Sequence, residues 1–326
     1  MSANTNTHAN AKPIVLVTEP LSERAMAYLR QRVEVRSCSP EAVGEHVAEV
    51  DGLLVRTYTQ VRSAVLDRAR RLKVVGRAGV ALENIDVDAC RSRGIVVVHM
   101  PAANTLAVVD YTIGMMVQLN RRFWPMQGVV TGEAFHAVRK GIYGRFLSGA
   151  TLGVVGVGRI GSRVGRAAVG LGMRVLWNDI KPISLDYEAQ EVDKETLFRE
   201  SDIVTIHTPH TATTDKFINE AALATFKPGA QFINAARGQC VDYHALADAV
   251  RDGHIGGCAI DCHDPEPPPP DYPMFVVAAE NDNVILTAHV AARVPAAMEA
   301  MSDVVYDIVA VLEGRPPQYP AEDGSY

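Results

Sequence analysis

Short apolar runs alternate with helix-like stretches along most of the chain. In the first part, strands are predicted at 13–17, 52–55, 73–76 and 95–98. Helices are predicted at 22–32 and at 63–71, the second of them beginning with Ser63 as its cap. This alternation is typical of a parallel sheet that is covered by helices.

A second block with the same rhythm begins at Thr151, after a predicted helix at 105–121 and an irregular segment at 125–148. Its strands are predicted at 151–156, 174–178, 203–206, 230–234, 257–261 and 284–287. A helix is expected at 159–171, an extended proline-rich loop at 265–273, and one last amphipathic helix at 295–312.

The two blocks predict an α/β protein with two doubly wound parallel-sheet domains. Residues 13–102 and 290–326 are expected to form one domain from the two ends of the chain. Residues 103–289 are expected to form a second domain inserted into the first. Residues 1–12 are polar and are predicted to be a disordered lead-in.

Composition narrows the class of protein. The 326 residues carry a formal net charge of −6, which argues against a nucleic-acid or anionic-membrane partner. No apolar run reaches the length of about 18 residues that a membrane span needs. The five cysteines form no C-x-x-C pair, which favours reduced thiols and the cytoplasm. Cys258, Cys262 and His263 lack zinc-ligand spacing, so no metal is expected.

A glycine-rich turn at 156–161 points to a dinucleotide. Gly156, Gly158 and Gly161 follow an apolar strand and precede a helix. Gly156 permits the tight turn, Gly158 admits a pyrophosphate to the backbone, and Gly161 lets the helix pack close to the strand. The helix N-terminus then offers free N–H groups to the phosphates.

Asp179 ends the next predicted strand, 18 residues after Gly161. A carboxylate there accepts hydrogen bonds from the adenosine ribose and repels a 2′-phosphate, which favours NAD over NADP. Lys181 weakens this preference if it faces the ribose. A glycine turn without a ligand is the alternative, but the strand, helix and acid together predict a Rossmann-type NAD domain.

Three further residues supply groups for hydride chemistry. Arg237 follows a predicted strand, where a guanidinium can grip a carboxylate. Glu266 and His289 follow the next two strands, and a carboxylate beside a histidine favours the imidazolium. Each residue alone has a structural alternative, but all three are predicted at the strand ends where open α/β sheets bind ligands.

With these motifs, the sequence resembles the D-isomer-specific 2-hydroxyacid dehydrogenase family, most closely its phosphoglycerate dehydrogenase branch. The resemblance covers about residues 13–316. It is carried by LGVVGVGRIG at 152–161, FINAARGQCV at 232–241 and IDCHDPEP at 260–267. The segment GRAGVALENID at 76–86 and the tetrapeptide LVRT at 54–57 resemble the branch's substrate-side motifs.

The resemblance implies roles for matching residues and a flavodoxin-like fold for the terminal domain. Arg237 is expected to bind the substrate carboxylate and carbonyl, His289 to exchange the proton, and Glu266 to pair with His289. The expected cofactor contacts are Gly156, Gly158, Arg159, Ile160, Gly161, Asp179, Thr208, Ala235 and Asp261. The expected substrate contacts are Arg56, Arg77, Gly79 and Val80. The arm at 125–148 is expected to clasp a partner in a homodimer.

Several positions depart from the family pattern. Ala288 replaces the usual proline before the histidine, and Ala291 and Arg293 replace small residues after it. His99 and Met100 stand where a small polar pair is usual. These changes weaken any inference about the substrate. The 37 residues after His289 are too few for the regulatory domains of the long forms, so none is expected.

The sequence therefore predicts an NAD-dependent enzyme that interconverts a 2-oxo acid and a D-2-hydroxy acid, with 3-phosphoglycerate or a similar anion as the substrate. The motifs leave open a reductase for glyoxylate, hydroxypyruvate or a phosphonate-bearing acid. An NAD-sensing, corepressor-like binding protein is a further alternative. Glu266 argues against a formate-type dehydrogenase on the same fold.

Overall fold

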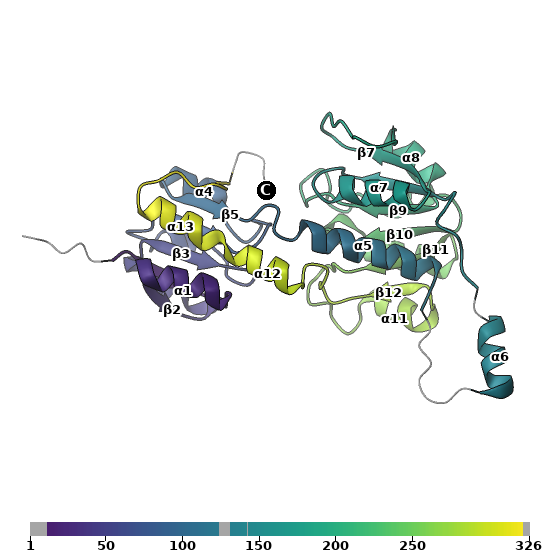
Figure 1. Ribbon diagram of the computed structural model, residues 1–326, viewed down its shortest axis with the longest axis horizontal. Helices are drawn as coiled ribbons and strands as arrows, with labels where there is room; N and C mark the ends of the chain where they lie inside the picture. The colour runs from purple at the N-terminus through teal and green to yellow at the C-terminus, as the bar shows by residue number, and fades with distance from the viewer. Residues whose placement is uncertain (1–11, 124–130, 142, 322–326) are drawn as a thin grey trace, which may run out of the picture. The chain divides into compact units, whose positions relative to one another are not determined.

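The computed structural model describes residues 12–123, 131–141 and 143–321. The chain divides into two compact units (Figure 1). Unit 1 contains residues up to Asn104 and from Arg293 onward, and unit 2 contains Thr105–Ala292. The sequence predicted these domain boundaries after residue 102 and before residue 290. The predicted lead-in, except for Lys12, lies outside the described residues.

Unit 1 is built on a five-stranded parallel sheet with the order β2-β1-β3-β4-β5. The strands are β1 (Ile14–Val17), β2 (Glu34–Ser37), β3 (Gly52–Val55), β4 (Val74–Arg77) and β5 (Val96–His99). The order reverses between β1 and β3, as in flavodoxin-like folds. Ligands bind such sheets beside the carboxyl ends of the strands at this reversal.

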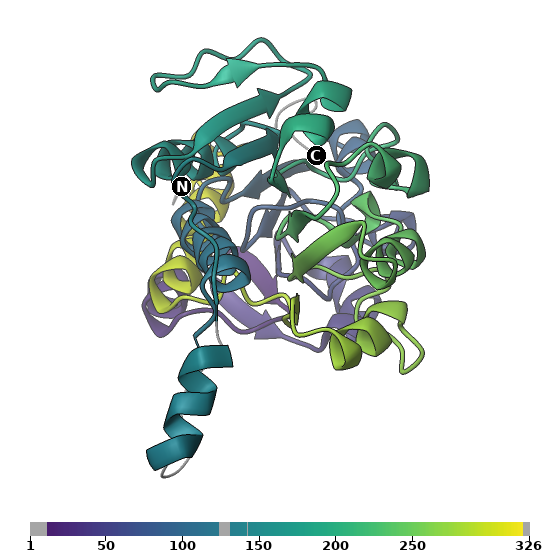
Figure 2. The same cartoon turned by 90° about the vertical axis from the view of Figure 1, so that its right-hand side faces the viewer.

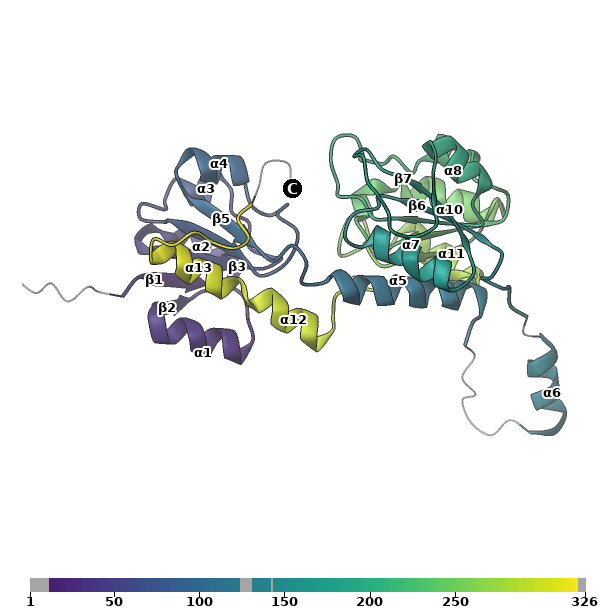
Figure 3. The same cartoon turned by 45° about the horizontal axis from the view of Figure 1, so that its top comes forward.

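Helices cover both faces of the unit 1 sheet (Figure 3). On one face lie α1 (Glu23–Arg32) and α13 (Val304–Leu312), which bury Leu29 and Ile308 against the sheet. The other face is covered by α2 (Val43–His46), α3 (Ser63–Leu66) and α4 (Val87–Ser92). Short 3₁₀ turns flank α2 at Pro40–Ala42 and Val47–Glu49. Consecutive residues such as Leu53 and Leu54 enter opposite cores, as strand geometry requires.

Unit 2 contains a seven-stranded parallel sheet with the order β12-β11-β10-β9-β6-β7-β8. The strands are β6 (Thr151–Val155), β7 (Arg174–Asn178), β8 (Gln190–Glu191), β9 (Ile203–Ile206), β10 (Ala230–Asn234), β11 (Ile255–Ile260) and β12 (Val284–Leu286). The order reverses between β6 and β9, which is the Rossmann arrangement. The predicted fold class is confirmed.

Two helical layers also enclose the sheet of unit 2. The helices α5 (Thr105–Asn120) and α7 (Gly161–Gly170) pack on one face. The other face is covered by α8 (Lys194–Glu200), α9 (Glu220–Ala224), α10 (Tyr243–Arg251) and α11 (Pro273–Glu280). A 3₁₀ turn at Gly238–Cys240 follows β10. The buried cores on the two faces fix the carboxyl ends of the strands, where the candidate site lies.

The segment predicted to be irregular at 125–148 contains a helix, so this prediction is wrong for its middle part. Helix α6 spans Gly132–Gly141, and residues 124–130 and 142 lie outside the described part. The alanines at 134 and 137 favour a helix between the two glycines. None of the α6 residues is buried, and α6 projects from the body of its unit (Figure 2).

Three predicted helix boundaries are also corrected. The last helix is two helices, α12 (Pro295–Ser302) and α13, which meet at Asp303. There the Asp303 N–H bonds only three residues back, to the Ala300 carbonyl, and the Ser302 hydroxyl competes for the Met298 carbonyl. Helix α3 ends at Leu66, because the N–H groups of Arg68 and Ala69 bond only three residues back, and its N-cap position is Arg62. Helix α7 begins at Gly161, two residues later than predicted.

Candidate active site

The turn between β6 and α7 is shaped by its three glycines. Gly156 has a φ of +88°, and a Cβ there would lie 2.9 Å from the carbonyl oxygen of His207. A Cβ at Gly161 would lie only 1.9 Å from the Gly156 carbonyl oxygen. At Gly158, by contrast, a Cβ would meet no heavy atom within 4 Å. Two glycines therefore permit the fold, and the third keeps the backbone open to a ligand.

Asp179 fixes this turn from the end of β7. Its Oδ2 accepts a hydrogen bond from the Val157 N–H at 2.9 Å, and its Oδ1 accepts one from the Lys181 N–H at 3.0 Å. The carboxylate is half-buried, and each oxygen retains a lone pair for another donor. It can therefore hold the turn and accept ribose hydroxyls together.

The surroundings of the turn fit the phosphate and ribose portions of a dinucleotide. A hollow of about 490 Å³ is lined by residues of the turn, including Arg159, and by the first residues of α7. Ile160 packs partly against the core, and the Thr208 methyl lies 3.1 Å from the position of a Cβ at Gly156. Ala235 follows β10 directly. The N-terminal amides of α7 add the donors that a pyrophosphate needs.

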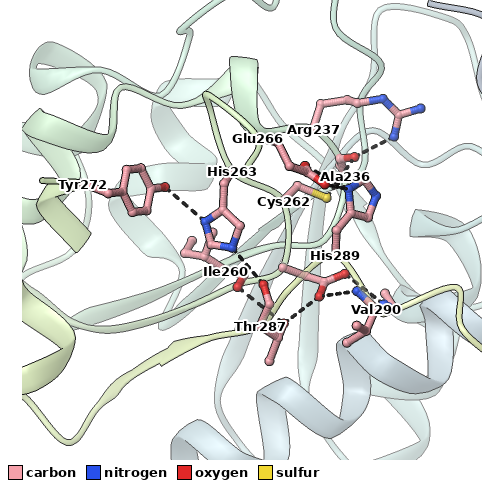
Figure 4. Close-up of polar contacts among 12 residues, drawn as sticks. Ala236, Arg237, Ile260, Cys262, His263, Glu266, Tyr272, Thr287, His289 and Val290 are labelled. Atoms are coloured by element: carbon pink, nitrogen blue, oxygen red, sulfur yellow. Dashed lines mark hydrogen bonds and ion pairs between the residues drawn. The ribbon is translucent and has the colours of Figure 1, made fainter. Parts of the chain in front are cut away.

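Arg237 lies in a turn that is held by Asn234 at the end of β10. The Asn234 Oδ1 accepts from the Ala236 N–H at 2.9 Å, and its Nδ2 donates to the Arg237 carbonyl at 2.9 Å. The Arg237 Nη1 donates to the Ala236 carbonyl at 2.6 Å. These bonds fix the backbone and the direction in which the guanidinium leaves it (Figure 4).

The arginine turn packs against the loop that follows β11. A Cβ at Gly238 would lie 1.9 Å from the His263 carbonyl oxygen, so only a glycine permits this approach. The Cys262 thiol donates to the same Ala236 carbonyl, at 3.4 Å, that accepts from Arg237. The arginine motif and the glutamate motif are therefore joined through backbone contacts.

Glu266 and His289 form a hydrogen-bonded ion pair. The His289 Nδ1 lies 2.7 Å from Oε1 and 2.9 Å from Oε2 of Glu266 (Figure 4). The His289 and Glu266 side chains are 44% and 42% exposed, respectively, so solvent-borne molecules can reach the pair. Since Nδ1 faces the carboxylate, Nε2 is the nitrogen left for a substrate.

The pair is charged at neutral pH. Contact with the Cys262 thiol, and then the hydrogen bond to Glu266, raise the pKa of His289 from 6.5 to about 10 despite partial burial. Burial alone raises the pKa of Glu266, but the hydrogen bond and charge of His289 outweigh it and lower that pKa. The arrangement therefore keeps a proton on His289.

Asp261 holds the turn that carries His289. Its fully buried carboxylate accepts from the Thr287 hydroxyl at 2.6 Å and from the N–H groups of Val290 and Ala291, each at 2.9 Å. Its carbonyl accepts from the His289 N–H at 2.9 Å. His289 has a left-handed φ of +52°, and these bonds stabilise that conformation. Asp261 thus has a positioning role that sequence reasoning missed.

The predicted substrate residues lie in unit 1, at the carboxyl ends of β3 and β4. Arg56 directly follows β3, and Arg77 ends β4. The Arg77 guanidinium lies across Gly79. A Cβ at Gly79 would be 1.2 Å from the Arg77 Nη1, so a side chain there would displace the guanidinium. The Arg56 guanidinium donates to the Pro20 carbonyl at 3.1 Å.

Two side chains that the sequence did not single out as ligands brace this edge of unit 1. The buried Glu19 carboxylate accepts from four consecutive backbone N–H groups, at 56–59. The buried His99 donates from Nδ1 to the Val80 carbonyl at 2.7 Å. One departure from the family pattern, His99, therefore supports the predicted substrate loop.

The comparisons with known proteins agree with this geometry. Residues 113–291 match the family model described as D-isomer specific 2-hydroxyacid dehydrogenase, NAD binding domain. The chain belongs to this family. The match confirms both the family resemblance and NAD as the cofactor that the glycine turn predicted.

Individual relatives of the family match almost the whole chain. D-3-phosphoglycerate dehydrogenase from Archaeoglobus fulgidus is 36% identical over 312 residues, which are 93% of this chain and 58% of that protein. Hydroxypyruvate reductase from Thermotoga maritima is 32% identical over 85% of this chain and 91% of that protein. The crystal structure of the TT0316 protein from Thermus thermophilus covers 95% of this chain and 100% of its own, with 35% identity and a TM-score of 0.83.

The chain spans little more than half the length of the first of these dehydrogenases, 58% in the Archaeoglobus protein. All five cysteines are unpaired. Within the described residues, no three His, Cys, Asp or Glu side chains are arranged to hold a metal ion. Among the described helices, none combines the length and apolarity of a membrane span.

Within the family's motifs, the sequence singled out the candidate chemical groups but not the residues that fix their backbone. Arg237, Glu266 and His289 lie in unit 2 with the cofactor turn. Asn234 was missed as a positioning residue, although it stands inside the quoted arginine motif. The signal for it was a polar residue at the end of an otherwise apolar strand.

Proposed function

We propose that this protein is an NAD-dependent dehydrogenase that interconverts a 2-oxo acid and a D-2-hydroxy acid. The observation that carries the proposal is the Glu266–His289 pair, in the same unit as the NAD turn and Arg237. A histidine that holds its proton at neutral pH suits the reduction of a carbonyl. Unit 2 is then the NAD-binding domain and unit 1 the substrate domain.

Bound NAD(H) supplies or accepts the hydride at C2 of the acid. The Arg237 guanidinium binds the substrate carboxylate and polarises the carbonyl. The His289 Nε2 delivers a proton to the carbonyl oxygen during reduction and removes it during oxidation, while Glu266 holds the Nδ1 proton. Asp261 keeps His289 in place through the turn at 287–291.

The cofactor is held by residues around the glycine turn. The open backbone at Gly158 and the N-terminus of α7 bind the pyrophosphate, and Asp179 accepts the ribose hydroxyls. The other members of this contact set are Gly156, Arg159, Ile160, Gly161, Thr208, Ala235 and Asp261. Within this set, Asp261 also orders the turn that carries His289.

The substrate is an anionic 2-oxo or 2-hydroxy acid such as 3-phosphoglycerate. Arg56 and Arg77 at the carboxyl ends of adjacent strands provide cationic groups for its tail. The backbone amide of Val80 binds its carboxylate, joined by that of Gly79 when it leaves the Arg77 carbonyl, to which it donates at 2.8 Å. Relatives named D-3-phosphoglycerate dehydrogenase support this choice. A reductase for hydroxypyruvate or a similar small acid is the second candidate, because a relative of that name matches over most of its own length.

The protein acts as a homodimer joined through α6. Apolar side chains along the arm are exposed, with Phe135 at 40%, Val138 at 45%, Tyr143 at 89% and Phe146 at 81%. Exposed apolar surface of this kind marks an interface. Light scattering should give twice the chain mass, and Phe135→Glu with Val138→Glu on α6 should give monomers. Val276→Glu on α11 is the matched control, and a monomeric wild type contradicts the proposal.

The unpaired cysteines fit a reducing compartment, and we place the protein in the cytoplasm.

The proposed reaction is tested by NADH oxidation against 2-oxo acids with and without phosphate or phosphonate tails. The phosphorylated three-carbon acid should give the highest kcat/KM, and the product should be the D-isomer. A maximum with hydroxypyruvate or glyoxylate instead selects the second candidate. No turnover with any member, together with tight NADH binding, contradicts both and favours an NAD-sensing binding protein.

A further inference from the structure

His263 is a buried histidine between Asp261 and Glu266 in the chain. Its Nε2 lies 2.8 Å from the Thr287 carbonyl oxygen, and its Nδ1 lies 3.2 Å from the Tyr272 hydroxyl (Figure 4). A carbonyl oxygen only accepts, so Nε2 donates to Thr287. Both ring nitrogens are therefore held by hydrogen bonds within unit 2.

The bond to Thr287 connects His263 with the turn that carries His289. The Thr287 carbonyl accepts from His263, while its hydroxyl donates to the Asp261 carboxylate at 2.6 Å. The same carboxylate accepts from two backbone N–H groups directly after His289, and the Asp261 carbonyl accepts from His289 itself. A continuous set of hydrogen bonds thus runs from the buried imidazole to the backbone of His289.

The backbone of His289 needs this support. Its φ of +52° is a left-handed conformation that a non-glycine residue keeps only when its surroundings impose it. Release of Thr287 would let the turn relax and would move Nδ1 away from Glu266, which it now meets at 2.7 Å.

We propose that His263 is a positioning residue for His289, and that its hydrogen bond to the Thr287 carbonyl holds the turn at 287–291 in the geometry that pairs His289 with Glu266. The catalytic consequence rests on the proposed function. The positioning itself concerns only contacts within unit 2 and can be measured without turnover.

Ring packing offers a competing explanation for His263. Its imidazole lies edge-on to Tyr272, with ring centroids 5.4 Å apart, and 6.5 Å from the Tyr243 ring. A phenyl ring could keep these contacts, but it would lose both hydrogen bonds. A glutamine side chain would lose the ring and keep a donor near the position of Nε2. His263→Phe and His263→Gln therefore separate packing from hydrogen bonding.

The test measures the pKa of His289 in the full chain by NMR titration of isotope-labelled imidazoles. Loss of the carboxylate partner should lower this pKa by about one unit or more in His263→Phe. His263→Gln should restore most of the wild-type value. His254→Phe is the matched control. It also removes a hydrogen bond from a histidine ring to a backbone carbonyl, that of Leu223 at 3.0 Å, but this bond has no connection to Asp261.

With an active substrate in hand, His263→Phe should lower kcat about tenfold or more and leave NADH affinity unchanged, since small displacements of a catalytic group are costly. If His263→Phe folds and keeps the wild-type pKa of His289, the proposal is wrong. It is equally wrong if His263→Gln behaves like His263→Phe although both variants unfold at the wild-type urea concentration. A protein that turns over no 2-oxo acid but shows the expected pKa changes refutes the proposed function alone.

Discussion

His289 and Glu266 are hydrogen-bonded in a fixed geometry, with Nδ1 2.7 Å from Oε1 and 2.9 Å from Oε2. The carboxylate orients the imidazole and favours its charged form. A proton donor for carbonyl reduction needs both effects, because its free nitrogen must face the substrate and carry a proton near neutral pH.

Glu266→Gln should lower the pKa of His289, because the neutral amide no longer stabilises the imidazolium. The alkaline limb of the pH profile for 2-oxo acid reduction should then move to lower pH by about one unit or more. The rate at neutral pH, where His289 stays protonated, should fall about tenfold or more because the amide no longer holds the imidazole in its orientation. Steady-state kinetics across the neutral and alkaline range measure both effects, and an unmoved alkaline limb would show that Glu266 does not control this proton.

Oxidation of the hydroxy acid should have the opposite pH dependence. The reaction needs neutral His289 as the base, and the pKa of this residue is raised to about 10. The oxidative kcat/KM should therefore rise through the alkaline range and level off near that pKa, while the reductive kcat/KM falls there. Parallel profiles in the two directions would contradict the assignment of His289.

The glycine turn allows a matched pair of alanine substitutions. Gly161→Ala should lower the free energy of unfolding by about 1–3 kcal/mol, because its Cβ would collide with the Gly156 carbonyl. Gly158→Ala meets no protein atom, so it should change stability by less than about 1 kcal/mol and still weaken NADH binding. Urea unfolding and NADH titration test the pair. Undiminished NADH affinity in Gly158→Ala would place the pyrophosphate elsewhere.

Asp179→Ser should raise the use of NADPH relative to NADH. Removal of the carboxylate removes its repulsion of a 2′-phosphate, which is worth about 1 kcal/mol or more and corresponds to about fivefold. The ratio of kcat/KM values for the two cofactors is the measurement. An unchanged ratio would mean that Asp179 serves only to hold the Val157 N–H.

The fold was predictable because its signals are local. Buried parallel strands appear in the sequence as short apolar runs, and their regular alternation with helices predicts parallel sheets covered by helices. Boundaries that depend on side-chain hydrogen bonds were not predictable. At the break between α12 and α13 the Ser302 hydroxyl donates to the Met298 carbonyl, and a serine inside an apolar helical pattern does not indicate which carbonyl its hydroxyl will bond.

The candidate site was predictable only in part, for the same reason. Arg237, Glu266 and His289 stand out because all three follow predicted strands at the edge where open α/β sheets bind ligands, although each alone has a structural alternative. Asp261 and His263 act through residues more than twenty positions away, such as Thr287 and Val290, so neither spacing nor residue type indicates their partners.

The most direct test of the account compares the wild type with Arg237→Ala and His289→Asn, using the most active 2-oxo acid. NADH binding, measured by fluorescence, should be nearly the same in all three proteins, because neither side chain belongs to the cofactor turn. The wild type should oxidise NADH and form the D-hydroxy acid, and each variant should lose turnover by about a thousandfold or more. Turnover that survives in either variant, or NADH binding that is lost with it, would contradict the account.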